Sequence, residues 1–182
     1  MADVLVSHEH PATRLGLCEM LGRHEDMPAI PVAGEAELWR EVRGRRPGAI
    51  ILSAGTGQGL VLCRRIASAA PEIAVVMCVR QDTPVARLAA ALAGARGVVA
   101  EGAGDQDLVR ALRRALSVRG READRPNPLV LHALQARVAP EDRAIVAMLL
   151  DGTSTADVAA VLGVTDAHAQ GRVDAILYAL GG

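Results

Sequence analysis

The sequence predicts two domains: an α/β domain built on a five-stranded parallel sheet, followed by an all-α domain. Over residues 1–118, short apolar runs alternate five times with segments of helical periodicity. After a charged stretch at 119–128 that carries two prolines, apolar residues recur only at helical spacing. Strands that alternate with helices indicate a parallel sheet covered on both faces, because each parallel connection must cross over the sheet.

Five apolar runs are the predicted strands. The third and fourth, GAIILS at 48–53 and EIAVVMCV at 72–79, are almost continuously apolar, which is typical of strands buried on both faces. The other three are shorter and are predicted at 3–7, 28–33 and 97–101. At this size the expected solution is the doubly wound, flavodoxin-like arrangement.

Five helices are expected to separate and follow these strands. Their apolar residues recur three or four positions apart, as they do on the buried face of a helix. The last helix shows this most clearly, with Leu108, Val109, Leu112 and Leu116 on one face. The predicted helices cover about 11–21, 36–42, 59–70, 84–94 and 105–118.

The stretch 138–182 contains three further amphipathic segments, preceded by a short predicted helix at about 129–135. Ser154 or Thr155 can cap the second segment, because a hydroxyl accepts a hydrogen bond from the first-turn amides. Thr165 can cap the third segment in the same way. The second and third segments are joined by a short turn at Gly163, so they form a helix-turn-helix, whose second helix is shaped for the major groove. Apolar residues mark the three helices: Ile145, Met148, Leu149; Val158, Val161, Leu162; Ala169, Val173, Ile176, Leu177, Leu180.

Composition narrows the function classes. All 20 basic side chains are arginine, so neither a Schiff-base lysine nor a P-loop lysine exists. No nucleophile–base constellation or metal-ligand spacing is present, and we therefore expect neither an enzyme nor a bound cofactor. Cys18, Cys63 and Cys78 lie in apolar surroundings, which indicates buried thiols in a reducing compartment. The first residues do not resemble a signal peptide and no apolar run reaches 18 residues, so we expect a cytoplasmic protein with no membrane partner.

The chain closely resembles the NarL/LuxR-type response regulators, in which a receiver domain precedes a helix-turn-helix domain. The resemblance rests most strongly on the helix-turn-helix pattern. In the first half it rests on VLVSHEHP at 4–11, PGAIILS at 47–53 and ARGVVAEG at 95–102. It implies a transcriptional regulator that binds double-stranded DNA, as a homodimer because paired half-sites match paired recognition helices. The implied domains are a receiver-like domain at 1–118, a linker at 119–128 and a LuxR-type helix-turn-helix domain at 129–182.

The resemblance also implies a phosphorylation pocket, but its reactive residues have changed. In the family, two acidic residues after the first strand hold Mg²⁺, and an Asp ending the third strand accepts the phosphoryl group. A Thr or Ser ends the fourth strand, and a Lys ends the fifth. Here these positions fall on His8 and Glu9, on Ser53, on Val79 (or Cys78, if the alignment is one residue off) and on Glu101. We therefore expect a pseudo-receiver that aspartyl phosphorylation does not control.

The altered pocket has two further interpretations. His8, Glu9 and His10 could bind a metal if the first strand continued, since alternate residues share a face. Three adjacent residues rarely form a site alone, so we expect no metal site there. The pocket could instead bind a small molecule at the carboxyl ends of the strands, lined by His8, Ser53 and Glu101, which would make the chain a small-molecule sensor. The alternative is an inert pocket with a structural role only.

By resemblance, the recognition helix runs from Thr165 to about Ala179. Gln170 can hydrogen-bond a base edge, and Arg172 can reach guanine or a phosphate. Threonine hydroxyls and helix-start amides can meet phosphates. The expected DNA-binding residues are Thr155, Thr165, His168, Gln170, Gly171, Arg172 and Asp174.

The charge of the helix-turn-helix domain leaves an alternative open. From 128 to 182 there are three arginines and six acidic residues, a net charge of −3. Since arginine and lysine contacts to phosphates supply most non-specific affinity, this domain starts at a disadvantage. Arg119, Arg121 and Arg125 could add charge, but we interpret them as part of a solvated linker. The alternative is a degenerate regulator that acts through protein–protein contacts.

Overall fold

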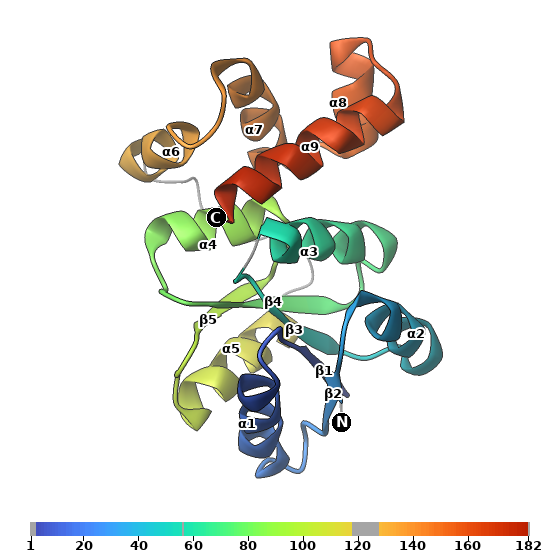
Figure 1. Cartoon of the computed structure of the whole chain (residues 1–182), viewed down its shortest axis with the longest axis vertical. Coiled ribbons are helices and arrows are strands. Elements are labelled where there is room, and N and C mark those ends of the chain that lie inside the picture. The colour runs from blue at the N-terminus through green and yellow to red at the C-terminus, as the bar shows by residue number, and fades with distance from the viewer. Residues whose placement is uncertain (1–2, 56, 118–127, 182) are drawn as a thin grey trace.

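The computed structural model describes residues 3–55, 57–117 and 128–181 (Figure 1). Its five strands form one parallel sheet in the order β2-β1-β3-β4-β5, which confirms the doubly wound prediction. The strands are β1 (Val4–Ser7), β2 (Ala29–Val32), β3 (Ala49–Ser53), β4 (Ala74–Val79) and β5 (Gly97–Ala100). All residues of β3 and β4 are buried, as expected for central strands covered on both faces.

Five helices cover the two faces of this sheet. Figure 1 shows α1 and α5 on one face and α2, α3 and α4 on the other. The hydrophobic core is correspondingly split in two, because successive residues of each strand point to opposite faces. The helices are α1 (Pro11–Gly22), α2 (Glu35–Arg45), α3 (Gly57–Ala69), α4 (Pro84–Leu92) and α5 (Asp105–Ser117).

The remaining described residues are helical. They form α6 (Pro128–Gln135), a 3₁₀ turn η1 (Pro140–Asp142), α7 (Arg143–Leu150), α8 (Thr155–Leu162) and α9 (Asp166–Leu180). The 3₁₀ turn was not expected from the sequence. The predicted linker lies almost wholly outside the described residues, and so do Arg119, Arg121 and Arg125.

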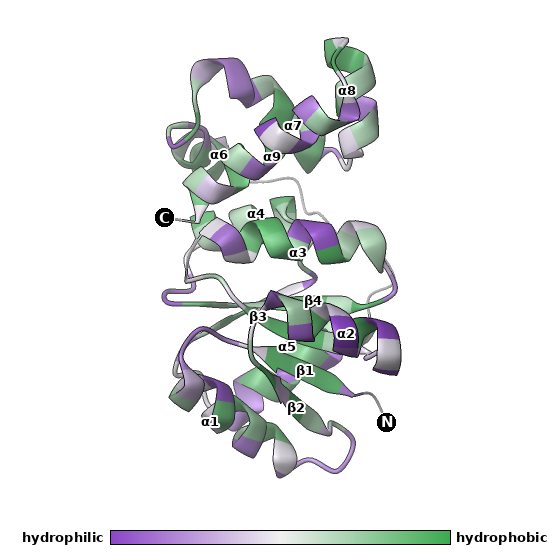
Figure 2. Ribbon diagram, turned by 45° about the vertical axis from the view of Figure 1, so that its right-hand side comes forward, coloured by the Kyte–Doolittle hydropathy of each residue, from purple (hydrophilic) through white to green (hydrophobic). Residues whose placement is uncertain are grey.

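The helical domain packs on the α3–α4 side of the receiver-like domain. α9 contacts α3, while α6 and α7 contact α4, and both views show the helices stacked above these two (Figures 1 and 2). Apolar residues of the helical domain, including Leu149 and Leu177, belong to the same hydrophobic cluster as residues of α3 and α4. The two domains therefore share one core on this side of the sheet. Among the described residues, no helix is long and apolar enough to cross a membrane.

Candidate nucleic-acid interface and altered receiver pocket

The helix-turn-helix is held by the local signals that predicted it. The hydroxyl oxygen of Ser154 accepts the backbone N–H of Asp157 at 3.1 Å and caps α8. The Thr165 hydroxyl accepts the N–H of His168 at 3.3 Å and caps α9. Gly163 ends α8 in the left-handed conformation, at φ +64°, which glycine adopts without a Cβ penalty. The start of each helix and the turn between them are thus fixed by local features of the sequence.

Asp174, one of the predicted DNA-contacting residues of α9, faces the receiver-like domain, and Gln170 is bonded to it. The Gln170 side-chain amide donates to Asp174 Oδ1 at 2.7 Å. The other oxygen of the same carboxylate accepts from Arg65 of α3 at 3.4 Å, and Arg65 also reaches Glu35 at 3.4 Å. Gln170 and Asp174 are both half-buried. In this arrangement, the Asp174 carboxylate accepts hydrogen bonds from Gln170 on the same helix and from Arg65 of α3.

Arg172 is engaged within the helical domain itself. Its guanidinium forms an ion pair with Asp142 of the 3₁₀ turn and a hydrogen bond at 3.4 Å to the Glu141 carbonyl. Its side chain is about one-third exposed (32%). Reaching a base or phosphate therefore requires Arg172 to leave a carboxylate, or to share its donors with one.

Thr155, a predicted phosphate contact, lies against a buried arginine of α3. Arg64 is only 8% exposed, and its guanidinium makes long contacts of 3.5 Å to the Thr155 hydroxyl and the Thr153 carbonyl. Its Nε has no hydrogen-bond partner among the described residues. Burial lowers the pKa of this guanidinium, because desolvation disfavours its charged form.

Other predicted DNA contacts are exposed. His168 and Gly171 face solvent, and the side chain of Thr165 is occupied as the cap of α9. The predicted set is therefore divided among exposed residues, residues that contact the receiver-like domain, and Arg172, which is paired within the helical domain.

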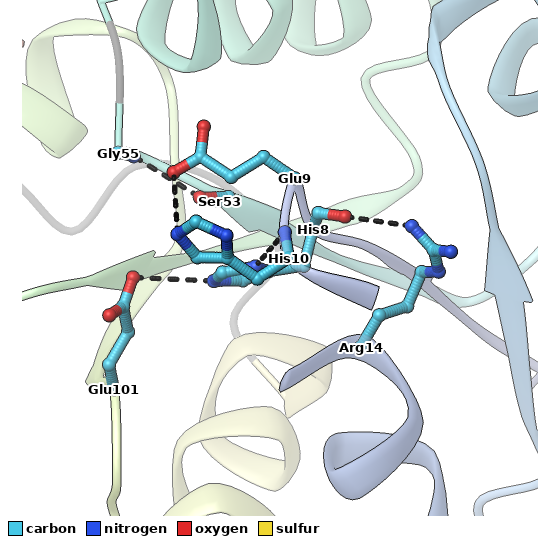
Figure 3. Close-up of polar contacts among 7 residues, drawn as sticks. All are labelled: His8, Glu9, His10, Arg14, Ser53, Gly55 and Glu101. Atoms are coloured by element: carbon cyan, nitrogen blue, oxygen red, sulfur yellow. Dashed lines mark hydrogen bonds and ion pairs between the residues drawn. The ribbon is translucent and has the colours of Figure 1, made fainter. Parts of the chain in front are cut away.

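The altered pocket forms at the carboxyl edge of the sheet (Figure 3). His8, which follows β1, is 3% exposed, and its Nε2 lies 3.3 Å from Glu101 Oε1. Its Nδ1 accepts the backbone N–H of His10 at 3.1 Å. The rings of His8 and His10 lie 5.6 Å apart, but the side chain of His10 is largely exposed. His8 and Glu101 are thus brought together as predicted, across 93 residues of sequence.

At the end of β4, Cys78 takes the predicted place of Val79 in the pocket. Cys78 pairs in register with Ser53, and both point to the α1–α5 face. Val79 points to the opposite face and packs in the other hydrophobic cluster. The residue in the pocket is therefore Cys78, the alternative to Val79 that an alignment shifted by one residue predicts. Burial, and then the nearby Glu101 carboxylate, raise the pKa of the Cys78 thiol to about 12.

Ser53 and Glu9 lie beside this group. The Ser53 hydroxyl oxygen accepts the N–H of Gly55 at 3.2 Å. Glu9 Oε1 lies 3.9 Å from His10 Nε2. A cleft of about 580 Å³ opens above them, between the sheet edge, α3 and α9. His8, Glu9, Ser53, Arg65 and Asp174 contribute to its lining, so it joins the altered pocket to α9, the predicted recognition helix.

Arg64 and Arg65 are the interface residues that the sequence reasoning missed. A signal for Arg64 existed: it stands four residues after Leu60, on the apolar side of α3. A charged residue at such a position requires a polar partner from elsewhere in the chain. Nothing in the sequence identifies the helical domain as the source of that partner.

No protein-family model matches the sequence. The chain is 24% identical over 193 residues to the DNA-binding transcriptional activator DevR/DosR of Mycobacterium tuberculosis, a match that covers 100% of this chain and 89% of that protein. In fold it is similar to RcsB of Salmonella enterica serovar Typhimurium bound to promoter rprA, with a TM-score of 0.58, 16% identity, and 100% of this chain and 93% of the other covered. It is also similar to the response regulator ChrA of a heme-sensing two-component system, with a TM-score of 0.53, 23% identity, and 94% and 86% covered. The chain therefore shares its fold, a five-stranded parallel-sheet domain followed by a helix-turn-helix, with these response regulators, as the sequence predicted.

Proposed function

We propose that this chain is a DNA-binding transcriptional regulator whose recognition helix is held against its receiver-like domain. The observation that carries the proposal is the helix-turn-helix of α8 and α9, with both caps and the Gly163 turn formed. The similarity to DevR/DosR over the whole chain supports the same function. Thr155, Thr165, His168, Gln170, Gly171, Arg172 and Asp174 remain the proposed DNA-contacting residues.

In this proposal, DNA binding requires α9 to move away from α3. A recognition helix must enter a major groove about 12 Å wide, with its side chains directed at base edges. Asp174 is instead paired with Arg65, and the Gln170 side chain donates to Asp174. The closed arrangement therefore competes with DNA, and weakening the α3–α9 contact increases DNA affinity by shifting the population toward the open form.

The trigger for opening in this proposal is not aspartyl phosphorylation. A serine, Ser53, occupies the acceptor position, and Glu101 places a carboxylate where the family has a lysine. A negative charge there repels a phosphoryl group instead of stabilising it. Incubation with acetyl phosphate and Mg²⁺ should leave the intact mass unchanged. A labile phosphoryl adduct would contradict this part of the proposal.

The direct test is selection of genomic DNA fragments at low salt, where phosphate contacts are strongest. We expect the wild-type chain to enrich a defined site, palindromic if the chain acts as a homodimer, and Arg172→Ala to lose it. Asp142→Ala is the matched control, because it removes the internal partner of Arg172 while keeping the guanidinium. If both variants lose the site equally, Arg172 acts by holding the fold. If the wild type and an interface variant such as Arg65→Ala both fail to enrich a site, the proposal is wrong.

A second candidate function is regulation through protein contacts. Its support is the net charge of −3 on the helical domain and the internal use of Gln170, Arg172 and Asp174. It predicts no fragment enrichment at any salt concentration.

A third candidate function is small-molecule sensing in the cleft between the altered pocket and α9, which His8 and Ser53 help to line. It predicts a compound that raises the melting temperature of the wild type. Its effect should be lost when Ser53 is changed to Ala or His8 to Gln.

A further inference from the structure

We propose that His8, Cys78 and Glu101 form a binding site for a divalent transition metal of the Zn²⁺ class. They offer an imidazole nitrogen, a sulfur and a carboxylate oxygen, and these ligand atoms all lie within 4.8 Å of one another. Their elements, β1, β4 and the turn after β5, meet at the carboxyl edge of the sheet. The site is thus formed only by the folded receiver-like domain, and it is independent of whether the chain binds DNA.

The distances suit a tetrahedral ion. With metal–nitrogen and metal–oxygen bonds of about 2.1 Å, two ligands of a tetrahedral zinc lie about 3.4 Å apart. His8 Nε2 and Glu101 Oε1 lie 3.3 Å apart. The sulfur of Cys78 lies within 4.8 Å of both atoms, within reach of a shared ion after side-chain adjustment. The Glu101 side chain, at 28% exposed, keeps one side of the site accessible to an entering ion.

The chemistry of the three ligands selects the kind of metal. A thiolate and an imidazole are the ligands of zinc and related borderline ions, whereas Mg²⁺ and Ca²⁺ require mostly oxygen ligands. One thiolate and one carboxylate together carry two negative charges, which a dication neutralises. A neutral site is the arrangement that burial of His8 and Cys78 favours. The substitutions that remove the receiver's magnesium chemistry therefore create a softer metal site.

Binding requires one local rearrangement. The lone pair of His8 Nε2 must face the metal, so the ring proton moves to Nδ1, which now accepts the N–H of His10. That hydrogen bond is then lost, a small cost against three metal–ligand bonds. The lost hydrogen bond is donated by His10, the residue that precedes α1. The three protein ligands leave the fourth position of a tetrahedral metal open to water.

The test is a Co²⁺ titration of the full chain after treatment with EDTA, followed by visible and near-ultraviolet absorption. We expect one Co²⁺ per chain, a thiolate-to-cobalt charge-transfer band and the intense visible bands of a tetrahedral ion. Zn²⁺ should displace Co²⁺, and a large excess of Mg²⁺ should not.

Ligand variants locate the site. Cys78→Ser should abolish the charge-transfer band, and His8→Gln and Glu101→Gln should each weaken binding by about 100-fold or more, since even indirect partners of a metal contribute 10–100-fold. Cys18→Ser and His168→Ala are matched controls and should bind Co²⁺ with the affinity of the wild type. Glu101 is partly exposed, so Glu101→Gln tests the site even if Cys78→Ser fails to fold.

Three outcomes would overturn the proposal. The first is the absence of a charge-transfer band in the wild type. The second is a band that disappears in Cys18→Ser but persists in Cys78→Ser. The third is wild-type affinity in a folded Glu101→Gln variant.

Discussion

At the scale of single residues, two buried polar groups are unusual in this chain. Arg64 is a buried cation whose closest polar contacts, to Thr153 and Thr155, are 3.5 Å long. Cys78 is a buried thiol beside a carboxylate. Both arrangements reduce the stability of the core, because each buries a polar or ionisable group whose loss of hydration is not fully offset by hydrogen bonds or an opposite charge. These two residues are therefore where substitution is most informative.

Replacing Arg64 by Met should stabilise the fold while weakening the contact between the domains. Met retains an apolar side chain of similar length and removes a charge that has no carboxylate partner in the described structure. We expect a gain of about 1 kcal/mol in unfolding free energy by urea titration, because replacing weakly compensated buried charges by apolar groups is often stabilising. Arg65→Met, at an exposed position, should change stability by about 0.5 kcal/mol or less. Loss of stability in Arg64→Met would show that the 3.5 Å contacts of Arg64 stabilise the fold by more than the burial of its charge costs.

The raised pKa of Cys78 predicts slow alkylation in metal-free protein. Because the pKa of Cys78 is raised to about 12, the thiol is protonated near neutral pH, so the reactive thiolate is scarce there and becomes more abundant only in strong alkali. Iodoacetamide treatment at about pH 8, followed by peptide mass spectrometry, should leave Cys78 unmodified in the native chain and modified in urea. Rapid modification of Cys78 under native conditions would contradict the buried environment assigned to it.

At the scale of elements, α3 and α9 approach each other through glycine. A Cβ at Gly57, the first residue of α3, would collide with the backbone of Tyr178 near the end of α9. A Cβ at Gly181, just after α9, would in turn lie 2.6 Å from the Cα of Gly57. Backbone cannot yield as the end of a flexible side chain does, so these contacts set how closely the two helices pack.

Gly57→Ala should therefore separate the end of α9 from α3. We expect a loss of about 1–3 kcal/mol in unfolding free energy, the usual cost of overpacking, together with a larger radius of gyration by small-angle X-ray scattering. Gly44→Ala is the matched control, because Gly44 lies in α2 with no atom within 4 Å of its added Cβ. It should gain about 0.5–1 kcal/mol from helix propensity and keep its dimensions. Unchanged dimensions in Gly57→Ala would mean that the helices adjust locally.

At the scale of the whole molecule, the two domains are joined by a shared apolar core with a polar contact at its border. Arg65 connects α3 to Asp174 of α9 and to Glu35 of α2. An exposed ion pair of this kind contributes about 1 kcal/mol or less, so it adjusts the closed arrangement while the apolar contact holds it. A charge change at this border is thus expected to shift the closed population without unfolding either domain.

A charge swap tests this arrangement. Arg65→Glu places a third carboxylate beside Asp174 and Glu35 and should increase the radius of gyration and the protease sensitivity of the chain. Adding Asp174→Arg restores an attractive contact and should bring both measurements back toward the wild type. Equal dimensions in all three proteins would show that the apolar contact alone determines the closed form.

The sequence by itself determined the strands and α-helices and their order, but not the short 3₁₀ turn. Continuous apolar runs predict β3 and β4, and alternation of strands with helices predicts a parallel sheet, because these are local patterns with one physical solution. Ser154, Gly163 and Thr165 predict the helix-turn-helix for the same reason: a cap or a left-handed turn depends on neighbours in sequence. The residues at the predicted pocket positions, His8, Ser53 and Glu101, could likewise be identified directly, since they lie at or just after the ends of predicted strands.

Only the tertiary structure decided which groups meet across long separations. The pairing of Asp174 with Arg65, and of Thr155 with Arg64, depends on how one domain docks on the other, which no local pattern encodes. The choice of Cys78 over Val79 depends on strand register, because a shift of one residue moves a side chain to the opposite face. The grouping of a nitrogen, a sulfur and an oxygen in one pocket follows from that register, since parallel strands bring their carboxyl ends together at a single edge of the sheet.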